Sequence, residues 1–293
     1  MSEIRGYDSF FRLDGKIALV TGGSRGIGLH TATAFLLAGA KKVIITARKS
    51  AGEQGIDQAV KKLNQIPGVA GHAVGIQANA ANTEEVAKLV DEVRKSDGTL
   101  DILVANAGAT WGGPFESTPD WSSQKILDLN VRGVFNLVRL FTPLLEAAGT
   151  SQDPSRVVKV SSVAGVNVPH VGENGTIMYS VSKAAANHLA RNLAVELGPR
   201  NITTNTVAPG FFPSKLANGL IGNLGGRDKL SSDVPRGRLG EPEDIAGVMI
   251  YLCSPAANYI WWQASGDRST EAVGYFFHGY ESRSINKHPK ENY

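Results

Sequence analysis

Tyr179 and Lys183 stand four residues apart and form the pair in this chain best suited to acid–base chemistry. They lie in an alanine-rich stretch whose pattern is typical of a helix, so both side chains project from one helical face. A free phenol has a pKa of about 10, too high for easy proton exchange at neutral pH, and a nearby ammonium lowers that pKa by stabilising the phenolate. A tyrosine and a lysine at this spacing are also common on ordinary surface helices. The pair therefore indicates a catalytic site only in combination with other motifs.

Two adjacent serines, Ser161 and Ser162, follow a short apolar run that ends at Val160. A hydroxyl at the end of a buried strand can polarise a substrate carbonyl by hydrogen bonding to its oxygen. Position alone does not choose between the two serines.

A glycine-rich turn occupies residues 21–28, between a predicted strand and a predicted helix. A pyrophosphate needs this order of elements, because small residues let the backbone approach and a helix N-terminus attracts an anion. Glycines also serve close packing of a helix on a strand, but the flanking elements favour a ligand site. The residues predicted to contact a cofactor here are Gly22, Ser24, Arg25, Gly26, Ile27 and Gly28.

The second predicted strand ends at Ala47 and is followed by Arg48, near the point where NAD-binding sheets usually carry an acidic residue. A guanidinium suits the 2′-phosphate of NADP through two parallel charge-assisted hydrogen bonds. Arg25 can reach the same phosphate from the glycine turn. Two solvated surface arginines are the alternative, and their place beside the expected adenosine site favours NADP(H) as the cofactor.

Turns after the third and fourth predicted strands carry small and amide residues. Asn79 is predicted to pair with the adenine amino group, and Ala80 is small enough to lie under the ring. Asn106, Ala107 and Gly108 are predicted to pass close to the cofactor. Read alone, either segment also fits a plain turn built on an asparagine side chain.

These motifs sit on alternating strands and helices, which predict an α/β fold: a single Rossmann-like, doubly wound parallel sheet with helices on both faces. The predicted division is a catalytic domain at 1–259 and an atypical tail at 260–293. Strands are predicted at 17–21, 42–47, 72–77, 102–105, 156–160 and 203–207, and helices near 27–38, 51–63, 83–95, 121–145, 179–197 and 242–252.

Of the 293 residues, 42% are apolar and 19% are charged, and the formal net charge is +3. This composition excludes a mainly disordered chain, and the charge is too small to indicate a nucleic-acid or membrane-surface partner. The lone cysteine, Cys253, excludes an internal disulfide and favours a cytoplasmic location. Neither a membrane-spanning run nor a signal-peptide pattern is recognised, and the histidines show no metal-ligand spacing, so no metal is predicted.

Together the motifs resemble the short-chain dehydrogenase/reductase family, and more narrowly its 3-oxoacyl-(acyl-carrier-protein) reductase branch, of the type associated with rhamnolipid synthesis. Their joint occurrence in this order, over most of the chain, is highly specific. The residues that carry the family resemblance are Thr21, Gly22, Gly26, Gly28, Asn106, Ala107, Gly108, Asn130, Ser162, Tyr179, Lys183 and, as further cofactor contacts, Pro209 and Gly210. The narrower resemblance rests on the stretches Ala109-Thr110-Trp111-Gly112 and Phe211-Phe212-Pro213-Ser214.

The resemblance implies a role for each residue of the acid–base site. Ser162, which stands three residues before a glycine, would polarise the carbonyl, and Tyr179 would donate the proton. Lys183 would lower the pKa of Tyr179 and bind the nicotinamide ribose, and Tyr179 would also contact the cofactor. Asn130 would hold a water that relays protons through Lys183.

Two segments depart from the family pattern. The loop between Ser162 and Tyr179 is a few residues longer than usual, and its His170 is interpreted as an exposed loop histidine rather than a substrate contact. After Ile260 the family normally continues through a last strand to an Asp-Gly-Gly turn. This chain instead has a different segment that begins with Trp261 and Trp262. The last strand and one subunit contact are therefore in doubt, so we predict a homodimer through the long helices, with a tetramer as the alternative.

The resemblance implies an NADPH-dependent carbonyl reductase acting on a 3-oxoacyl thioester, free or on a carrier protein, or on a related ketone. Arginines that could serve an acidic carrier protein, Arg132, Arg139 and Arg191, are interpreted first as solvated helix charges. One rival is an NADP-linked alcohol dehydrogenase of secondary metabolism. Another is a catalytically silent NADP-binding regulatory protein.

Overall fold

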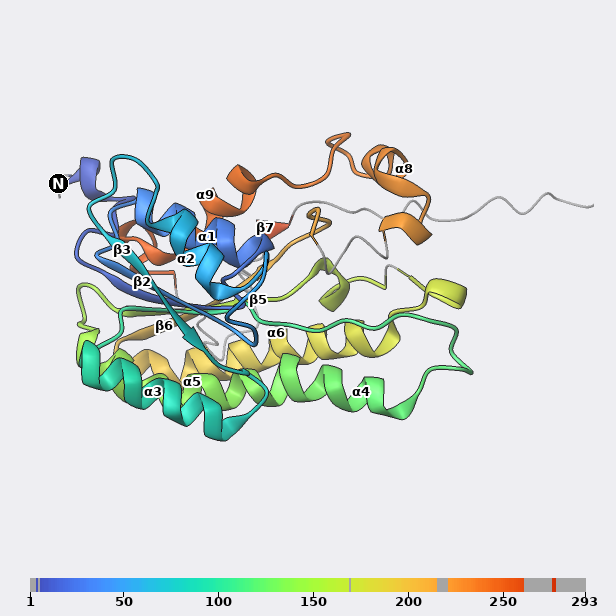
Figure 1. Ribbon diagram of the computed structural model, residues 1–293, viewed down its shortest axis with the longest axis horizontal. Helices are drawn as coiled ribbons and strands as arrows, with labels where there is room; N and C mark the ends of the chain where they lie inside the picture. The colour runs from blue at the N-terminus through green and yellow to red at the C-terminus, as the bar shows by residue number, and fades with distance from the viewer. Residues whose placement is uncertain (1–3, 5, 169, 215–220, 261–275, 278–293) are drawn as a thin grey trace, which may run out of the picture.

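Seven parallel strands form one sheet, in the order β3-β2-β1-β4-β5-β6-β7 (Figure 1). The computed structural model describes residue 4 and residues 6–168, 170–214, 221–260 and 276–277. The predicted doubly wound parallel fold is confirmed. The strands are β1 (Ile17–Thr21), β2 (Lys42–Ala47), β3 (His72–Gln77), β4 (Ile102–Ala105), β5 (Ser155–Val160), β6 (Ile202–Ala208) and β7 (Phe276–Phe277).

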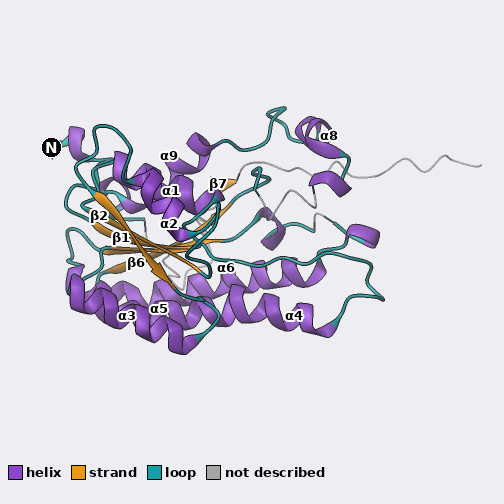
Figure 2. Cartoon of the chain, in the orientation of Figure 1, coloured by secondary structure: helices purple, strands orange, loops and turns teal. Residues whose placement is uncertain are grey.

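Helices cover both faces of the sheet, with α1, α2 and α9 on one side and α3, α5 and α6 on the other (Figure 2). Alternate residues of a strand enter opposite layers: Val20 packs towards α1 and α9, whereas Leu19 packs towards α3 and α5. Within the described part of the chain, no helix combines the length and apolarity needed to cross a bilayer. The helices are α1 (Gly26–Leu37), α2 (Ile56–Leu63), α3 (Thr83–Ser96), α4 (Asp120–Leu127), α5 (Gly133–Ala148), α6 (Ile177–Leu197), α8 (Gly226–Ser232) and α9 (Pro242–Cys253).

The long helix predicted at 121–145 is interrupted by a π-helical turn, Asp128–Arg132, that separates α4 from α5. Two tertiary contacts explain the interruption. The side chain of Asn130 is fully buried and bonds to neighbouring segments. A Cβ on Gly133 would lie 2.6 Å from the carbonyl oxygen of Ala80, so the chain approaches the loop after β3 very closely here. Such π turns inside helices frequently mark functional sites.

A two-residue strand completes the described sheet. Phe276 pairs with Val207 and Phe277 pairs with Ala208, both in parallel register on the outer edge of β6. The sequence left the last strand in doubt, and the structure places this short strand within the replaced segment. Trp261 and Trp262 lie outside the described residues. The proposed division into a domain at 1–259 and a tail at 260–293 stays a prediction.

Candidate active site

The candidate site lies where β4, β5 and β6 end, because parallel strands bring the loops that follow them to one edge of the sheet. Two backbone hydrogen bonds join the ends of β5 and β6: Ser161 N donates to the carbonyl of Val207 at 2.7 Å, and Val163 N donates to that of Pro209 at 3.0 Å. The serine turn after β5 and the Pro209 turn after β6 are thereby held side by side.

Tyr179, Ser162 and Lys183 come together at this edge. The hydroxyls of Ser162 and Tyr179 share a hydrogen bond. Lys183 Nζ lies 5.5 Å from the centroid of the Tyr179 ring and donates to the carbonyl of Val160 at 3.1 Å. Ser161 Oγ instead donates to the carbonyl oxygen of Lys183 at 3.2 Å. The geometry therefore separates the two serines, and Ser162 is the one beside the phenol.

The charge states at this site follow from burial. Burial raises the pKa of Tyr179, and the hydrogen bond from Ser162 only partly opposes that rise. Burial also lowers the pKa of Lys183 to about 8. The Lys183 ammonium lies over the Tyr179 ring and bonds to Val160, and the lowering of the Tyr179 pKa by Lys183 stays a prediction. In this structure the phenol is a protonated acid at neutral pH, next to a lysine that can exchange its proton near pH 8.

Asn130 lies close to Lys183, and its side chain makes three structural hydrogen bonds. Its Nδ2 donates to the carbonyl of Ala109 at 2.9 Å and to Ser182 Oγ at 3.0 Å, and its Oδ1 accepts from Ala109 N at 2.9 Å. These bonds fix the loop after β4 against α6. A Cβ on Gly108 would lie 3.3 Å from Asn130 Oδ1 and 3.7 Å from Lys183 Nζ, so this loop passes directly over the buried lysine.

The glycine turn has the geometry of a phosphate cradle. Gly22 has a φ of +67°, a conformation that favours glycine, and a Cβ on Gly28 would lie 2.3 Å from the carbonyl oxygen of Gly22. Arg25 stands at the N-cap of α1 without a side-chain capping hydrogen bond, so it leaves the first amides of the helix to another acceptor. Ser24 and Ile27 lie in the same turn, buried and half-buried. The turn fits a pyrophosphate.

The two arginines predicted at the adenosine end are both exposed. Arg25 Nη1 donates to Gln54 Oε1 at 3.0 Å, which ties the glycine turn to the segment between β2 and α2. Arg48 lies at the start of that segment. Gly23 N donates to the carbonyl of Thr46 at 3.1 Å, so the glycine turn and the end of β2 are neighbours.

In the turns after β3 and β4, the asparagine side chains make hydrogen bonds to nearby backbone groups. Asn79 Oδ1 accepts from Ala81 N at 3.2 Å, as in a plain asparagine turn. Asn106 Nδ2 donates to the carbonyl of Thr21 at 2.8 Å, and Thr21 Oγ1 accepts from the amides of Asn106 and Ala107 at 3.0 Å. These bonds shape the floor of the cradle by joining the ends of β1 and β4.

Comparisons with known proteins agree with this geometry. A profile of the family described as enoyl-(acyl carrier protein) reductase matches residues 22–264. The rhamnolipids biosynthesis 3-oxoacyl-[acyl-carrier-protein] reductase of Pseudomonas aeruginosa is 37% identical over 251 residues, which span 86% of this chain and 94% of that protein. The chain belongs to the short-chain dehydrogenase/reductase family.

A further curated relative and a solved structure are also similar to this chain. The 7alpha-hydroxysteroid dehydrogenase of Escherichia coli is 33% identical over 249 residues, 85% of this chain and 91% of that protein. The solved Pseudomonas aeruginosa RhlG/NADP active-site complex matches with a TM-score of 0.78 at 37% identity, covering 87% of this chain and 95% of that chain. Family membership confirms the resemblance and the expected oxidoreductase. The names of these relatives denote an acyl thioester and a steroid, so membership does not fix the substrate.

The long loop that departs from the family pattern packs against the loop after β6. His170 is half-buried rather than exposed, because its ring packs 5.8 Å from that of Phe211, in the loop after β6. Burial lowers the pKa of His170. Phe211 in turn contacts a small apolar cluster of Ile221, Leu230 and Leu239 around α8.

One polar residue beside the site was passed over in the sequence. Lys159, the fifth residue of β5, is 1% exposed and donates from Nζ to the carbonyl of Ala105 at 3.2 Å. Its signal in the sequence was a lysine set between valines in a predicted buried strand.

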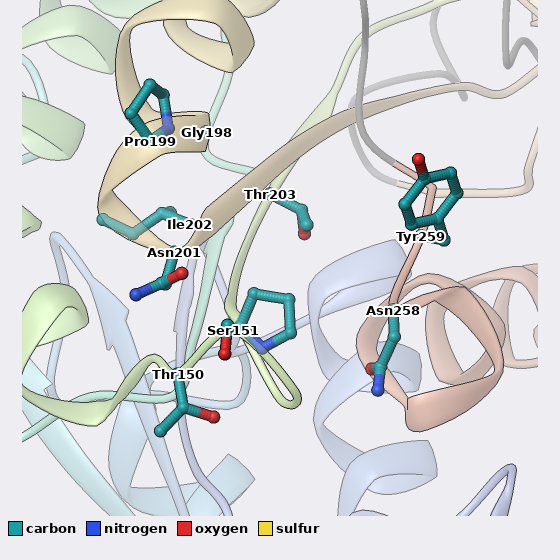
Figure 3. A pocket seen from close by; sticks show the side chains of 10 residues that line it. Thr150, Ser151, Gly198, Pro199, Asn201, Ile202, Thr203, Asn258 and Tyr259 are labelled. Atoms are coloured by element: carbon teal, nitrogen blue, oxygen red, sulfur yellow. The ribbon is translucent and has the colours of Figure 1, made fainter.

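A pocket of about 330 Å³ lies away from this family's catalytic edge (Figure 3). Its lining includes Pro154 and Ile202, at the amino ends of β5 and β6, together with Asn201, Asn258 and Tyr259. The lining contains no charged side chain. The pocket lies at the amino ends of the strands, opposite the candidate active site, and contributes no residue to that site.

Proposed function

We propose that this protein is an NADPH-dependent carbonyl reductase that acts on a 3-oxoacyl thioester, free or bound to a carrier protein, or on a related ketone. The observation that carries the proposal is the convergence of Ser162, Tyr179 and Lys183 beside the glycine cradle. A regulatory protein that only bound the nucleotide would need no acid–base group at this place. The intact trio therefore argues against the silent alternative.

The cofactor assignment has support from the residues and from a relative. Gly22, Gly26 and Gly28 would hold the pyrophosphate, and the guanidinium groups of Arg25 and Arg48 would hold the 2′-phosphate. The solved Pseudomonas aeruginosa relative is a complex with NADP. When bound, the cofactor supplies the hydride, so the protein supplies position and proton transfer.

A protonated phenol is the form of Tyr179 that the reductive direction requires. A general acid must carry its proton at the working pH, and burial keeps the pKa of Tyr179 raised. Ser162 would hold the carbonyl oxygen that receives the proton. Lys183, with a pKa of about 8, would return a proton to the phenolate. Asn130 would serve by holding the loop over Lys183. Its role in holding a water that relays protons stays a prediction.

A substrate panel tests the function directly. The purified protein is expected to oxidise NADPH with acetoacetyl thioesters and to do so faster than with a panel of cyclic ketones. The measurement is the decrease in NADPH absorbance with each substrate. Failure to turn over any carbonyl compound while binding NADPH would contradict the proposal.

One specific observation favours a second substrate class. The Escherichia coli relative is named for a hydroxysteroid, which is a cyclic secondary alcohol. Faster turnover of cyclic ketones than of acetoacetyl thioesters would therefore assign the chain to the alcohol dehydrogenase alternative.

We further infer an isologous homodimer in the cytoplasm, formed through α5 and α6. Val134, Val138 and Leu193 face the sheet and are buried, but Phe135 and Val181 are 44% and 49% exposed on the outer side. Such apolar side chains on neighbouring helices suit a second copy of the chain.

The assembly can be measured by light scattering coupled to size exclusion. A dimer mass is expected at micromolar concentration, and Phe135→Glu is expected to give monomers because it places charge in the contact. A stable tetramer would show that the altered terminus still builds a second interface, and a monomer would contradict the inference.

A further inference from the structure

Lys159 is a buried amine that the proposed reaction does not use. Val157 and Leu19 pack towards α3 and α5, whereas Val158 and Val160 pack towards α1 and α9. Lys159 alternates with Val158 and Val160, so it faces the layer that contains Lys183. Its hydrogen bond to the Ala105 carbonyl ends at the last residue of β4, directly before the loop that crosses Lys183.

Among the residues that the structure describes, no acidic side chain acts as a counter-charge to Lys159. β4 and β6, which flank it in the sheet, have no titratable side chain. On α6 the nearby titratable groups are Lys183 and Tyr179, and Lys183 is the group whose charge acts on Lys159. Asp128, in the π turn, already pairs with Arg132 at 2.8 Å. The charged residues of α5, Arg139 and Glu146, are exposed.

Burial next to another cation makes the charged form of this lysine unfavourable. Burial, and then the charge of Lys183, holds the pKa of Lys159 well below its ordinary value. An amine buried in this way lowers the stability of the fold, since the unfolded chain would carry the proton in water. A methionine of similar length would fill the same space without that penalty. Costly buried polar groups are expected mainly at functional sites.

We propose that Lys159 is a positioning residue for the reduction: its uncharged amine holds the end of β4 over Lys183 and keeps the interior beside Lys183 at a single positive charge. The kinetic half of this inference rests on the proposed reductase, whereas the charge state of Lys159 does not. Entry of a second proton would set two cations against each other. It would displace the Lys183 ammonium from Val160 and disturb its neighbour Tyr179.

The charge state is tested by thermal unfolding of Lys159→Met. At pH 7 the variant is expected to melt about 2 °C or more above the wild type, because the desolvated amine is gone. The unfolded wild-type chain binds a proton that the folded chain lacks, so wild-type stability rises as the pH approaches the ordinary lysine pKa of about 10.5. The difference between the two proteins should therefore shrink from pH 7 to pH 10. A difference that does not change with pH would overturn the uncharged assignment.

The positioning role is tested by the pH profile of kcat at saturating NADPH. The wild type is expected to lose activity on the acid side, where Lys159 takes up a proton, and in Lys159→Met this acid limb should move down by about one pH unit or vanish. In the alkaline plateau kcat should fall severalfold, because the end of β4 has lost its hydrogen bond, while the Kd for NADPH is unchanged. Identical profiles in the two proteins would overturn the proposal. Absence of any reductase activity, combined with the expected melting curves, would reject the proposed function and leave the charge assignment standing.

Lys42→Met is a matched control. Lys42 is also a strand lysine of low exposure, but its Nζ pairs with Asp97 at 2.7 Å. It lies on β2, whereas Lys159 lies on β5, and it is far from Tyr179 in the sequence. Its removal is expected to lower the melting temperature, because Asp97 loses its partner, and to leave the pH profile of kcat as in the wild type. A control variant that reproduced the Lys159→Met profile would show that the effect is unspecific.

Discussion

Replacing Tyr179 with phenylalanine is expected to lower kcat by about two orders of magnitude or more while NADPH binding is retained. The aromatic ring and its packing against Lys183 stay in place, but the hydroxyl that bonds to Ser162 is lost. The reacting carbonyl then has no positioned proton donor. The effect should fall on kcat, because the hydroxyl acts at the reacting oxygen rather than in the cradle.

The measurement combines steady-state kinetics with titration of NADPH fluorescence. Tyr7→Phe is a suitable control, since Tyr7 is 70% exposed and lies in a short helical turn that precedes β1. That variant should match the wild type in both readouts. Undiminished turnover in Tyr179→Phe would remove Tyr179 from the mechanism, and a lost affinity for NADPH would mean that the substitution acts on the cofactor site instead.

Most of the strands could be predicted from the sequence because their burial is nearly uniform. β1 and β4 are buried along their whole length, so their residues form uninterrupted apolar runs bounded by turns. The π turn between α4 and α5 could not be predicted, because it depends on contacts of Asn130 and Gly133 with segments distant in the sequence. The helix predicted from residue 51 begins only at Ile56, since a Cβ on Gly55 would lie 2.2 Å from the carbonyl oxygen of Ser50.

The positions of the site residues could be predicted, but their electrostatics could not. Spacing placed Tyr179 and Lys183 on one helical face, and the order of the motifs brought Ser162 to the same edge. The direction of the Tyr179 pKa shift depends on how deeply the ring is buried and on what Lys183 Nζ contacts, and neither is visible in the sequence. Lys159 was missed for the same reason, because a lysine in a sequence reads as a surface residue until its neighbours are known.

Removing the Arg48 side chain, as in Arg48→Ala, is expected to raise the KM for NADPH roughly tenfold to a hundredfold and to change the KM for NADH much less. NADPH differs from NADH by its 2′-phosphate, and loss of a charge-assisted hydrogen bond to that group costs about 1.5–3 kcal/mol. Arg48 is exposed at the end of β2, beside the glycine turn, and is free of the tie to Gln54 that restrains Arg25. Within the described residues, it can therefore turn towards a phosphate without breaking a side-chain hydrogen bond of the fold.

The ratio of the two KM values, measured by steady-state kinetics at constant ionic strength, is the quantity that decides this assignment. Arg94→Ala removes another exposed arginine, one that pairs with Asp91 on α3, and controls for a general loss of positive charge. That control should leave the ratio unchanged. An equal rise of both KM values in Arg48→Ala would show that Arg48 supports the loop rather than the 2′-phosphate. The preference for NADPH would then have to come from Arg25, whose hydrogen bond to Gln54 would open when the nucleotide binds.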